Sequence, residues 1–517
     1  MTCCKDPQNK DRIVFKLLLG IEIFSLTLVC LGIAPRELIL VSSALVLFYL
    51  IVSPIEDGLL FFIASIPIFV ALPISENFDS LSAGRLFILI LFLKWLWQKK
   101  TLILPKIKFL SFKEIFKNYR LELFSLILLI IMGISLINAI DIGAGAKRLI
   151  YLINLIVLFV MIKDLIKNHE YFKRTIKAIL ISLGIVCVIG LLQLISAYFF
   201  TIGGFWDWWA DHISLSFYGE NLRQIVKTNN AWFIASPSGS SVIRLFGSFT
   251  DPHSFALYIL LALPFVISIS IFAFKQKFNK RWFWWLLCLF FIILSGTRGI
   301  WFGIIAAFLA GIYLLIRKMN QSRVVSSIMV ILVVFIALVP VVSVFTTIPQ
   351  FNEHGSSQDA SLILKRLISV LNLDETSNQG RIYIWKKSLE SFKQYPLLGV
   401  GTGNFPIILE QDIALAKAGS SAHNLYLNFL AENGIFALIL IGLIFLESLI
   451  ALISILKLNL SWRNRILITG LFVFLFWTFA YCFFDIALLD ERVFLLFLTI
   501  LGLIFAIKKN PKVLENE

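Results

Sequence analysis

The chain has 517 residues, of which 59% are hydrophobic, and its mean hydropathy is +0.90. No soluble domain is this apolar over such a length, so the composition predicts a membrane protein with many spans. The formal net charge of +15 does not indicate nucleic-acid binding, because the Lys and Arg residues stand in short clusters between apolar runs.

The apolar runs predict the transmembrane helices in chain order. A span needs about 20 apolar residues, or fewer in a tight bundle. Fourteen segments qualify: 14–33, 38–53, 58–75, 84–98, 122–140, 147–163, 177–200, 252–274, 282–296, 299–316, 325–346, 431–456, 466–485 and 493–507. We therefore predict an all-α polytopic membrane protein with about 14 transmembrane helices, within a range of 12–14.

The basic clusters predict the orientation of these helices. If the N-terminus is cytoplasmic and the spans alternate, every long inner connection carries several Lys or Arg residues, as in 99–120, 163–177 and 275–281. The short outer connections are poor in them, and 76–83 has none. The positive-inside rule thus places both termini in the cytoplasm. The six cysteines fall outside the predicted outer segments and lack metal-ligand spacing, so we expect no disulfide framework.

Two outer segments are long. The first, 201–251, is rich in aromatic residues, and its Asp207 and Asp211 could pair as metal ligands or belong to an interfacial aromatic belt. The second is a large extracytoplasmic loop over 347–430, with predicted amphipathic helices at 359–372 and 380–394 that would lie along the membrane surface. We divide the chain at these loops into an N-terminal transmembrane region 1–240, a central region 241–440 and C-terminal helices 441–517.

Polar residues and glycines gather in three stretches at the outer ends of spans. Residues 244–256 contain Arg-x-x-Gly and an Asp251-Pro-His253 sequence that suits a helix start. Residues 295–301 contain Ser-x-Thr-Arg-Gly, whose glycines would hold Arg298 at the tip of a tight turn. Residues 380–434 contain Arg-x-x-x-Trp, Pro-Leu-x-Gly-x-Gly-x-Gly-Asn-Phe and His-Asn-x-Tyr-Leu, the last beginning at His423. The glycines at 399–403 favour a flexible turn over a phosphate-binding loop, because no strand precedes them.

This ordered set of motifs resembles the bacterial O-antigen ligase and polymerase superfamily, whose members join sugars outside the cytoplasmic membrane. The resemblance covers residues 240–440 by motif and the rest by the pattern of spans. The chain differs where His253 follows Pro252, since the family more often has Asn there, and fourteen spans exceed the common twelve. The resemblance implies an enzyme of the bacterial cytoplasmic membrane with an undecaprenyl-diphosphate-linked glycan as donor.

The residues agree with such an enzyme. Two arginines, Arg244 and Arg298, would bind the diphosphate leaving group in pairs of hydrogen bonds and replace a divalent cation. His423 would act as general base on the acceptor hydroxyl, and attack opposite the diphosphate would invert the anomeric centre. We therefore expect an inverting, metal-independent glycosyltransferase without a cofactor. The motifs add five candidate substrate-binding residues: Asp251, His253, Arg381, Asn424 and Tyr426.

Each residue also has a purely structural interpretation. Arg298 could cap a turn, Arg244 could anchor a span, and His423 or His253 could begin a helix. The acceptor remains open: a lipid core sugar, a growing polymer or a protein would each present a hydroxyl. A polymerase is slightly favoured over a ligase, and a flippase for lipid-linked oligosaccharides or a protein O-oligosaccharyltransferase are the alternatives. A transporter, however, usually keeps charged residues near the middle of the bilayer.

Overall fold

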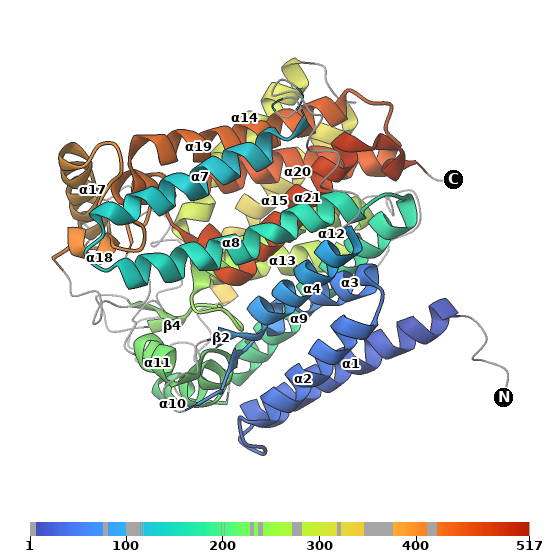
Figure 1. Cartoon of the computed structure of the whole chain (residues 1–517), viewed down its shortest axis with the longest axis horizontal. Helices are drawn as coiled ribbons and strands as arrows, with labels where there is room; N and C mark the ends of the chain where they lie inside the picture. Colours follow the sequence, from blue (N-terminus) through green and yellow to red (C-terminus); the bar gives the residue numbers. More distant parts are fainter. Residues whose placement is uncertain are drawn as a thin grey trace.

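Almost every ordered element in the computed structural model is a helix, and the long helices run roughly side by side (Figure 1). The structure describes residues 7–75, 81–99, 114, 116, 118–197, 199–200, 202–227, 232–235, 241–270, 282–317, 322–345, 376–410 and 421–515. One end of the bundle carries α10, α11, α17 and α18, and we call it the loop end. Helix α1 begins and α21 ends at the opposite end, as an even number of crossings requires.

Each of the fourteen predicted apolar segments overlaps a helix in the described part of the chain. These are α1 (Pro7–Cys30), α2 (Leu38–Val52), α3 (Ile55–Ser65), α4 (Ala83–Lys99), α7 (Arg120–Ser135), α8 (Ile142–Leu165), α9 (His169–Ser196), α12 (Pro252–Ser270), α13 (Trp282–Leu294), α14 (Arg298–Ile316), α15 (Ser322–Phe345), α19 (Leu425–Leu456), α20 (Trp462–Tyr481) and α21 (Glu491–Lys509). The all-α polytopic architecture is thereby confirmed.

The number of spans is not confirmed. Among the described residues, nine helices are long and apolar enough to cross a membrane. The predicted span 58–75 is wrong as a single helix, because α3 has only 11 residues and covers roughly 17 Å of a hydrocarbon core about 30 Å thick. The short 3-10 helix η1 (Ile66–Ile68), which contains Pro67, follows it, and the chain then forms the hairpin of β1 (Ala71–Leu72) and β2 (Leu81–Ser82).

Helices α12 and α20 lie at the centre of the bundle. Nearly every residue of α12 is buried, and the helix packs against α20, α13, α9 and α21. A helix that is apolar on all sides belongs inside the protein rather than against lipid. Polar pairs join the helices around it, such as Lys508 with Glu447 at 2.9 Å. Glu447, a carboxylate within the bundle, is thus paired with a cation.

The first long loop folds into a small domain over the loop end. It contains α10 (Ile202–Trp208), the π-helix η3 (Trp209–Ser214), α11 (Leu215–Lys227) and the hairpin of β3 (Phe233–Ala235) with β4 (Ser241–Ile243). Trp209 and Trp232 are buried, so these two form a core rather than an interfacial belt. Asp207 and Asp211 form ion pairs with Lys227, and Asp211 also pairs with Arg223.

The second long loop contributes α17 (Thr376–Gln394) and the short α18 (Phe405–Ile408). The amphipathic helix predicted at 380–394 is therefore present, whereas the one predicted at 359–372 lies outside the described residues. Three further 3-10 helices complete the fold: η2 (Leu136–Asn138), η8 (Ala487–Leu489) and η9 (Pro511–Leu514).

Helix α19 is broken near its start, and the glycine-rich segment fills the break. Gly434 has φ 79° and ψ −174°, a conformation that only glycine adopts readily. The freed backbone groups pair with the segment after α17: the amide of Gly401 donates to the carbonyl of Glu432 at 2.9 Å, and that of Ile435 donates to Pro396 at 3.0 Å. The predicted flexible turn is thus a tightly packed one, since a Cβ on Gly399 would lie 2.3 Å from the carbonyl carbon of Glu432.

Candidate active site

His423 stands immediately before the start of α19. The side chain of Asn424 caps the helix by accepting hydrogen bonds from the amides of Tyr426 (3.0 Å) and Leu427 (3.1 Å). His423 itself has φ +44°, a left-handed conformation that costs a non-glycine residue about 1–3 kcal/mol. Its side chain is 42% exposed. The imidazole is thus held next to the capped start of α19 and remains partly accessible.

Asp485 lies between two histidines. It follows α20, and its Oδ1 accepts the amide of Ala487 at 2.9 Å. Its Oδ2 is 3.5 Å from Nδ1 of His423 and also 3.5 Å from Nδ1 of His253. Burial alone would raise the pKa of Asp485, but His253, His423 and Arg381 lower it more, so that the pKa lies well below its ordinary value. The group is therefore a carboxylate that can orient an imidazole.

His253 occupies the first turn of α12, as the sequence predicts. The carboxylate of Asp251 accepts the amides of His253 (2.8 Å) and Ser254 (2.9 Å), and this caps the helix. Nδ1 of His253 lies 3.0 Å from the hydroxyl of Tyr481 at the end of α20. Burial and the nearby Asp485 raise the pKa of Asp251. Asp251 thus caps the start of α12, and His253 beside it contacts Asp485 and Tyr481.

Arg244 follows strand β4 and is buried, with 2% of its surface exposed. Its Nε donates to the carbonyl of Ser295 at 2.7 Å, and one terminal nitrogen lies 3.5 Å from the hydroxyl of Thr297. Burial lowers the pKa of Arg244 to about 10, which leaves the guanidinium charged at neutral pH. Asp251, Arg298 and Asp485 all act on this charge.

The turn predicted at Ser295–Gly299 is present, and Arg298 begins α14 directly after it with 8% of its surface exposed. The glycines on either side of Arg298 allow the close packing around it. A Cβ on Gly296 would lie 2.9 Å from Ile234, and one on Gly299 would lie 2.6 Å from Phe484. The turn is thus pressed between the β3–β4 hairpin and the end of α20, which brings Arg298 close enough to Arg244 for their charges to interact.

Helix α17 places Arg381 beside these residues. The indole nitrogen of Trp385, one turn along the same helix, donates to the carbonyl of Ala422 at 2.9 Å. This bond joins α17 to the residue before His423. Arg381 acts electrostatically on His253, Tyr481 and Asp485. The structure therefore brings together Arg244, Asp251, His253, Arg298, Arg381 and His423 from segments far apart in the sequence.

Asn424 and Tyr426 differ from the other predicted residues. Asn424 is occupied as the helix cap, and the hydroxyl of Tyr426 donates to the carbonyl of Phe479 at 2.7 Å. The ring of Tyr426 also packs on Phe483, with 4.3 Å between centroids. The side-chain oxygen of Asn424 and the hydroxyl proton of Tyr426 are thus used within the fold. Their contribution is to fix α19, and with it His423, against α20.

Sequence reasoning missed Asp485 and Tyr481. Both fall within the predicted span 466–485, where a carboxylate next to Phe483 and Phe484 would have been an unexplained charge at the end of a span. That signal was available. Within the described part of the chain, no group of three or more His, Cys, Asp or Glu side chains is arranged to hold a metal ion.

Comparison with known protein families finds a family model that matches part of the chain around the candidate site. A family model described as O-antigen ligase matches residues 283–442, the stretch that contains Arg298, Arg381 and His423. No curated protein matches the chain. The family model and the all-α membrane architecture agree with the motifs. The chain is therefore a multi-pass membrane protein whose residues 283–442 match the O-antigen ligase family, and this match supports its assignment to the O-antigen ligase and polymerase superfamily and a function in surface polysaccharide biosynthesis.

Proposed function

We propose that the protein transfers a glycan from undecaprenyl diphosphate to a sugar hydroxyl at the outer face of the bacterial cytoplasmic membrane, with both termini in the cytoplasm. The observation that carries the proposal is the convergence of two buried arginines with a carboxylate-bound histidine at one end of the bundle. A diphosphate leaving group needs cations, and an attacking hydroxyl needs a base. The site supplies both.

The arginines would stabilise the leaving group. As the bond between the anomeric carbon and the diphosphate oxygen breaks, negative charge grows on that oxygen. Arg244 and Arg298 carry permanent charge, and a guanidinium can donate two parallel hydrogen bonds to phosphate oxygens. Because both arginines are buried, water screens their charges less than it would at a surface. This arrangement would perform the task of a divalent cation and underlies our expectation of metal independence.

His423 would accept the proton from the acceptor. Asp485 faces Nδ1 of His423, which leaves Nε2 to take the hydroxyl proton while the new bond forms between the acceptor oxygen and the anomeric carbon. The carboxylate stabilises the imidazolium that results. Attack from the side opposite the diphosphate would invert the anomeric centre and release undecaprenyl diphosphate into the membrane. Arg381 and His253 would line the glycan path.

The test uses purified protein in detergent, a synthetic undecaprenyl-diphosphate oligosaccharide and EDTA. Release of undecaprenyl diphosphate with a mass ladder of products supports a metal-independent polymerase, the slightly favoured alternative. One addition to a supplied lipid core or peptide indicates a ligase or a protein glycosyltransferase. If no diphosphate is released and vesicles containing the protein move the intact substrate between leaflets, the protein is a flippase and the proposal is wrong.

A further inference from the structure

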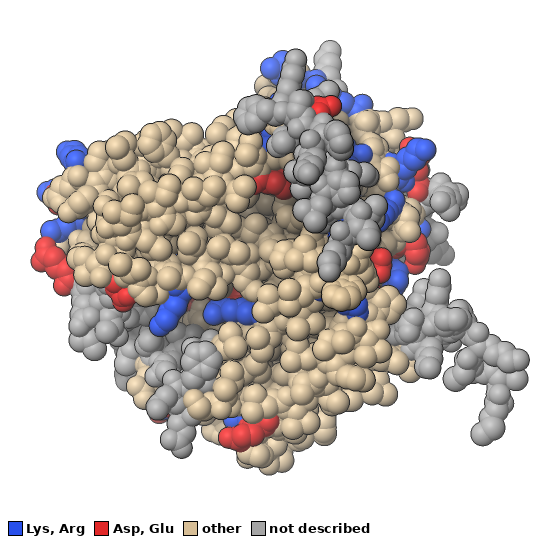
Figure 2. All heavy atoms as spheres, viewed as in Figure 1, with Lys and Arg blue, Asp and Glu red and all other residues tan. Residues whose placement is uncertain are grey.

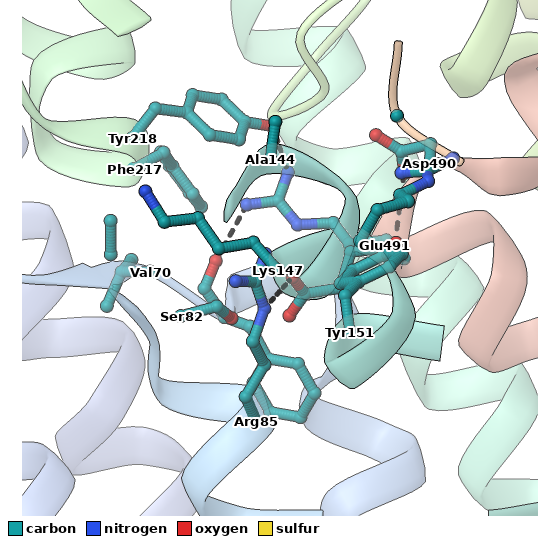
Figure 3. A pocket seen from close by; sticks show the side chains of 15 residues that line it. Val70, Ser82, Arg85, Ala144, Lys147, Tyr151, Phe217, Tyr218, Asp490 and Glu491 are labelled. Atoms are coloured by element: carbon teal, nitrogen blue, oxygen red, sulfur yellow. Dashed lines mark hydrogen bonds and ion pairs between the residues drawn. The ribbon is translucent and has the colours of Figure 1, made fainter. Parts of the chain in front are cut away.

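A second group of cations lines a pocket outside the candidate active site. The pocket has a volume of about 620 Å³, and Figure 3 shows its lining. Its charged residues come from three helices that all begin here: Arg85 on α4, Lys147 and Arg148 on α8, and Glu491 and Arg492 on α21, with Asp490 as the cap of α21. We call this the basic pocket.

Some of these charges hold the fold together. Arg492 donates to the carbonyl of Phe69 at 2.7 Å and to the hydroxyl of Tyr218 at 2.6 Å, and it also binds the carbonyl of Ser248. Arg85 forms an ion pair with Glu491 at 2.9 Å. These contacts use both cations within the protein and leave the shape of the pocket fixed.

The two remaining cations have no such partner. Lys147 is exposed and makes no hydrogen bond or ion pair within the described residues, and its side chain extends into the pocket (Figure 3). Arg148 lies over the ring of Tyr151, 5.1 Å from its centroid, and forms no ion pair in the same part of the chain. Two carboxylates face four cations in all. The positive ends of three helix dipoles add to this excess, so the pocket suits an anion.

The surroundings of the basic pocket point to a membrane lipid as the carrier of that anion. On α8, Ile150 and Ile153 are 66% and 45% exposed, and on α4 Leu89 and Leu93 are 42% and 53% exposed. Exposed aliphatic residues on transmembrane helices face lipid. Figure 2 shows Lys and Arg atoms in the middle of a face that is otherwise largely uncharged, where Figure 1 places α4 and α8. A lipid headgroup could therefore enter from the side.

The basic pocket lies next to the candidate active site, since Asp490 of the pocket and Asp251 of the site are close enough to interact electrostatically. Asp485 of the site and Asp490 of the pocket lie on either side of η8. The carbonyl of Ser248 accepts the hydroxyl of Tyr218 at 2.5 Å on the pocket side, and Asp251 follows three residues later on the site side. A glycan anchored by its phosphate in the pocket could thus reach His423.

We propose that the basic pocket binds the diphosphate of a second lipid-linked glycan, the acceptor, while Arg244 and Arg298 bind the diphosphate of the donor. This rests on the proposed function and deepens it, because an enzyme with two lipid-diphosphate sites joins two lipid-linked glycans. The acceptor keeps its own diphosphate throughout. Only the donor loses its bond to undecaprenyl diphosphate, and the proton leaves from the acceptor hydroxyl.

The experiment counts bound lipids by native mass spectrometry of the purified protein with undecaprenyl diphosphate. We expect two molecules on the wild type and one on Lys147→Glu, with the second restored in Lys147→Arg. Lys387→Glu is the matched control, since Lys387 lies on α17 and forms its one ion pair among the described residues with the exposed Glu410, at 3.1 Å. It should still bind two. Equal melting temperatures of the variants would show that each remains folded.

A kinetic measurement separates the substrates. With a lipid-linked acceptor, Lys147→Glu should raise KM by about 10- to 100-fold, the usual worth of a charge-assisted contact, and change kcat little. With a phosphate-free oligosaccharide as acceptor, KM should not change.

Two results would overturn the inference. In the first, Lys147→Glu still binds two molecules of undecaprenyl diphosphate. In the second, a parallel titration shows that the substitution abolishes only the binding of cardiolipin or phosphatidylglycerol. In the second case the pocket holds a resident phospholipid. Failure of the proposed function looks different, because the wild type would bind lipid yet form no glycosidic bond.

Discussion

Replacing Asp485 with Asn tests whether the carboxylate supports His423 as a base. The substitution keeps the Oδ1 that accepts the amide of Ala487, so the turn after α20 should persist. The charge 3.5 Å from Nδ1 of His423 is lost. At that separation, two unit charges interact by about 5 kcal/mol for an effective dielectric constant near 20. Because the His423 side chain is 42% exposed, we reduce this to about 2–3 kcal/mol.

That energy corresponds to a roughly 30- to 150-fold fall in kcat for Asp485→Asn. The assay is release of undecaprenyl diphosphate at saturating donor. Glu410→Gln is the matched control, since that carboxylate is 80% exposed. An unchanged kcat, or a loss confined to donor affinity, would refute the role assigned to Asp485.

Four further predictions follow from the site and its supports. His423→Ala should lower kcat by about 10²- to 10⁴-fold without weakening donor binding, measured by lipid titration, and a loss of affinity alone would contradict the base assignment. Arg298→Lys should lower transfer by about 10²-fold because lysine lacks the planar fork, whereas full activity would show that charge alone suffices. Burial raises the pKa of Asp490 to about 7, so the folded state binds this proton more tightly than the unfolded state does. The free energy of unfolding should therefore fall as the pH rises from about 4 to 7. Asp490→Asn, which keeps the helix cap, should flatten this pH dependence in thermal melts. Gly434→Ala should cost roughly 2–5 kcal/mol of unfolding free energy, since its Cβ would lie 2.1 Å from the carbonyl oxygen of Leu397, and an unchanged melting temperature would exclude this contact.

The helices could be predicted because a long apolar run is a local signal. The prediction failed at 58–75, where the run continues past Ser65 but the backbone does not remain helical. Hydropathy does not register the turn that Pro67 and the β1–β2 pairing introduce. The buried tryptophans of the first loop were misjudged for a similar reason, since composition alone cannot tell an aromatic core from an aromatic belt.

The site could be predicted in part, because a charge at the end of a span needs an explanation. Arg244, Arg298 and His423 stood out in that way, and the structure brings them to one place. Asp485 carries the same signal at the end of the predicted span 466–485 and was missed, and the helix of that span in fact ends at Tyr481. The helix cap made by Asn424 was not predicted, because its neighbours in sequence do not reveal that its side-chain oxygen accepts the first amides of α19.

The break in α19 has a consequence for how the chain is made. A helix entering a bilayer alone must satisfy its own backbone, and the opening at Gly434 leaves groups that only the 396–401 segment satisfies. Residues 396–401 are synthesised before α19. The first turns of α19 nevertheless cannot insert stably into lipid until this segment has packed against them. The amide of Leu425 also donates to the carbonyl of Cys482, which is made later still. His423 therefore reaches its final position only after α20 has been inserted, and a partly synthesised chain lacks the complete candidate site.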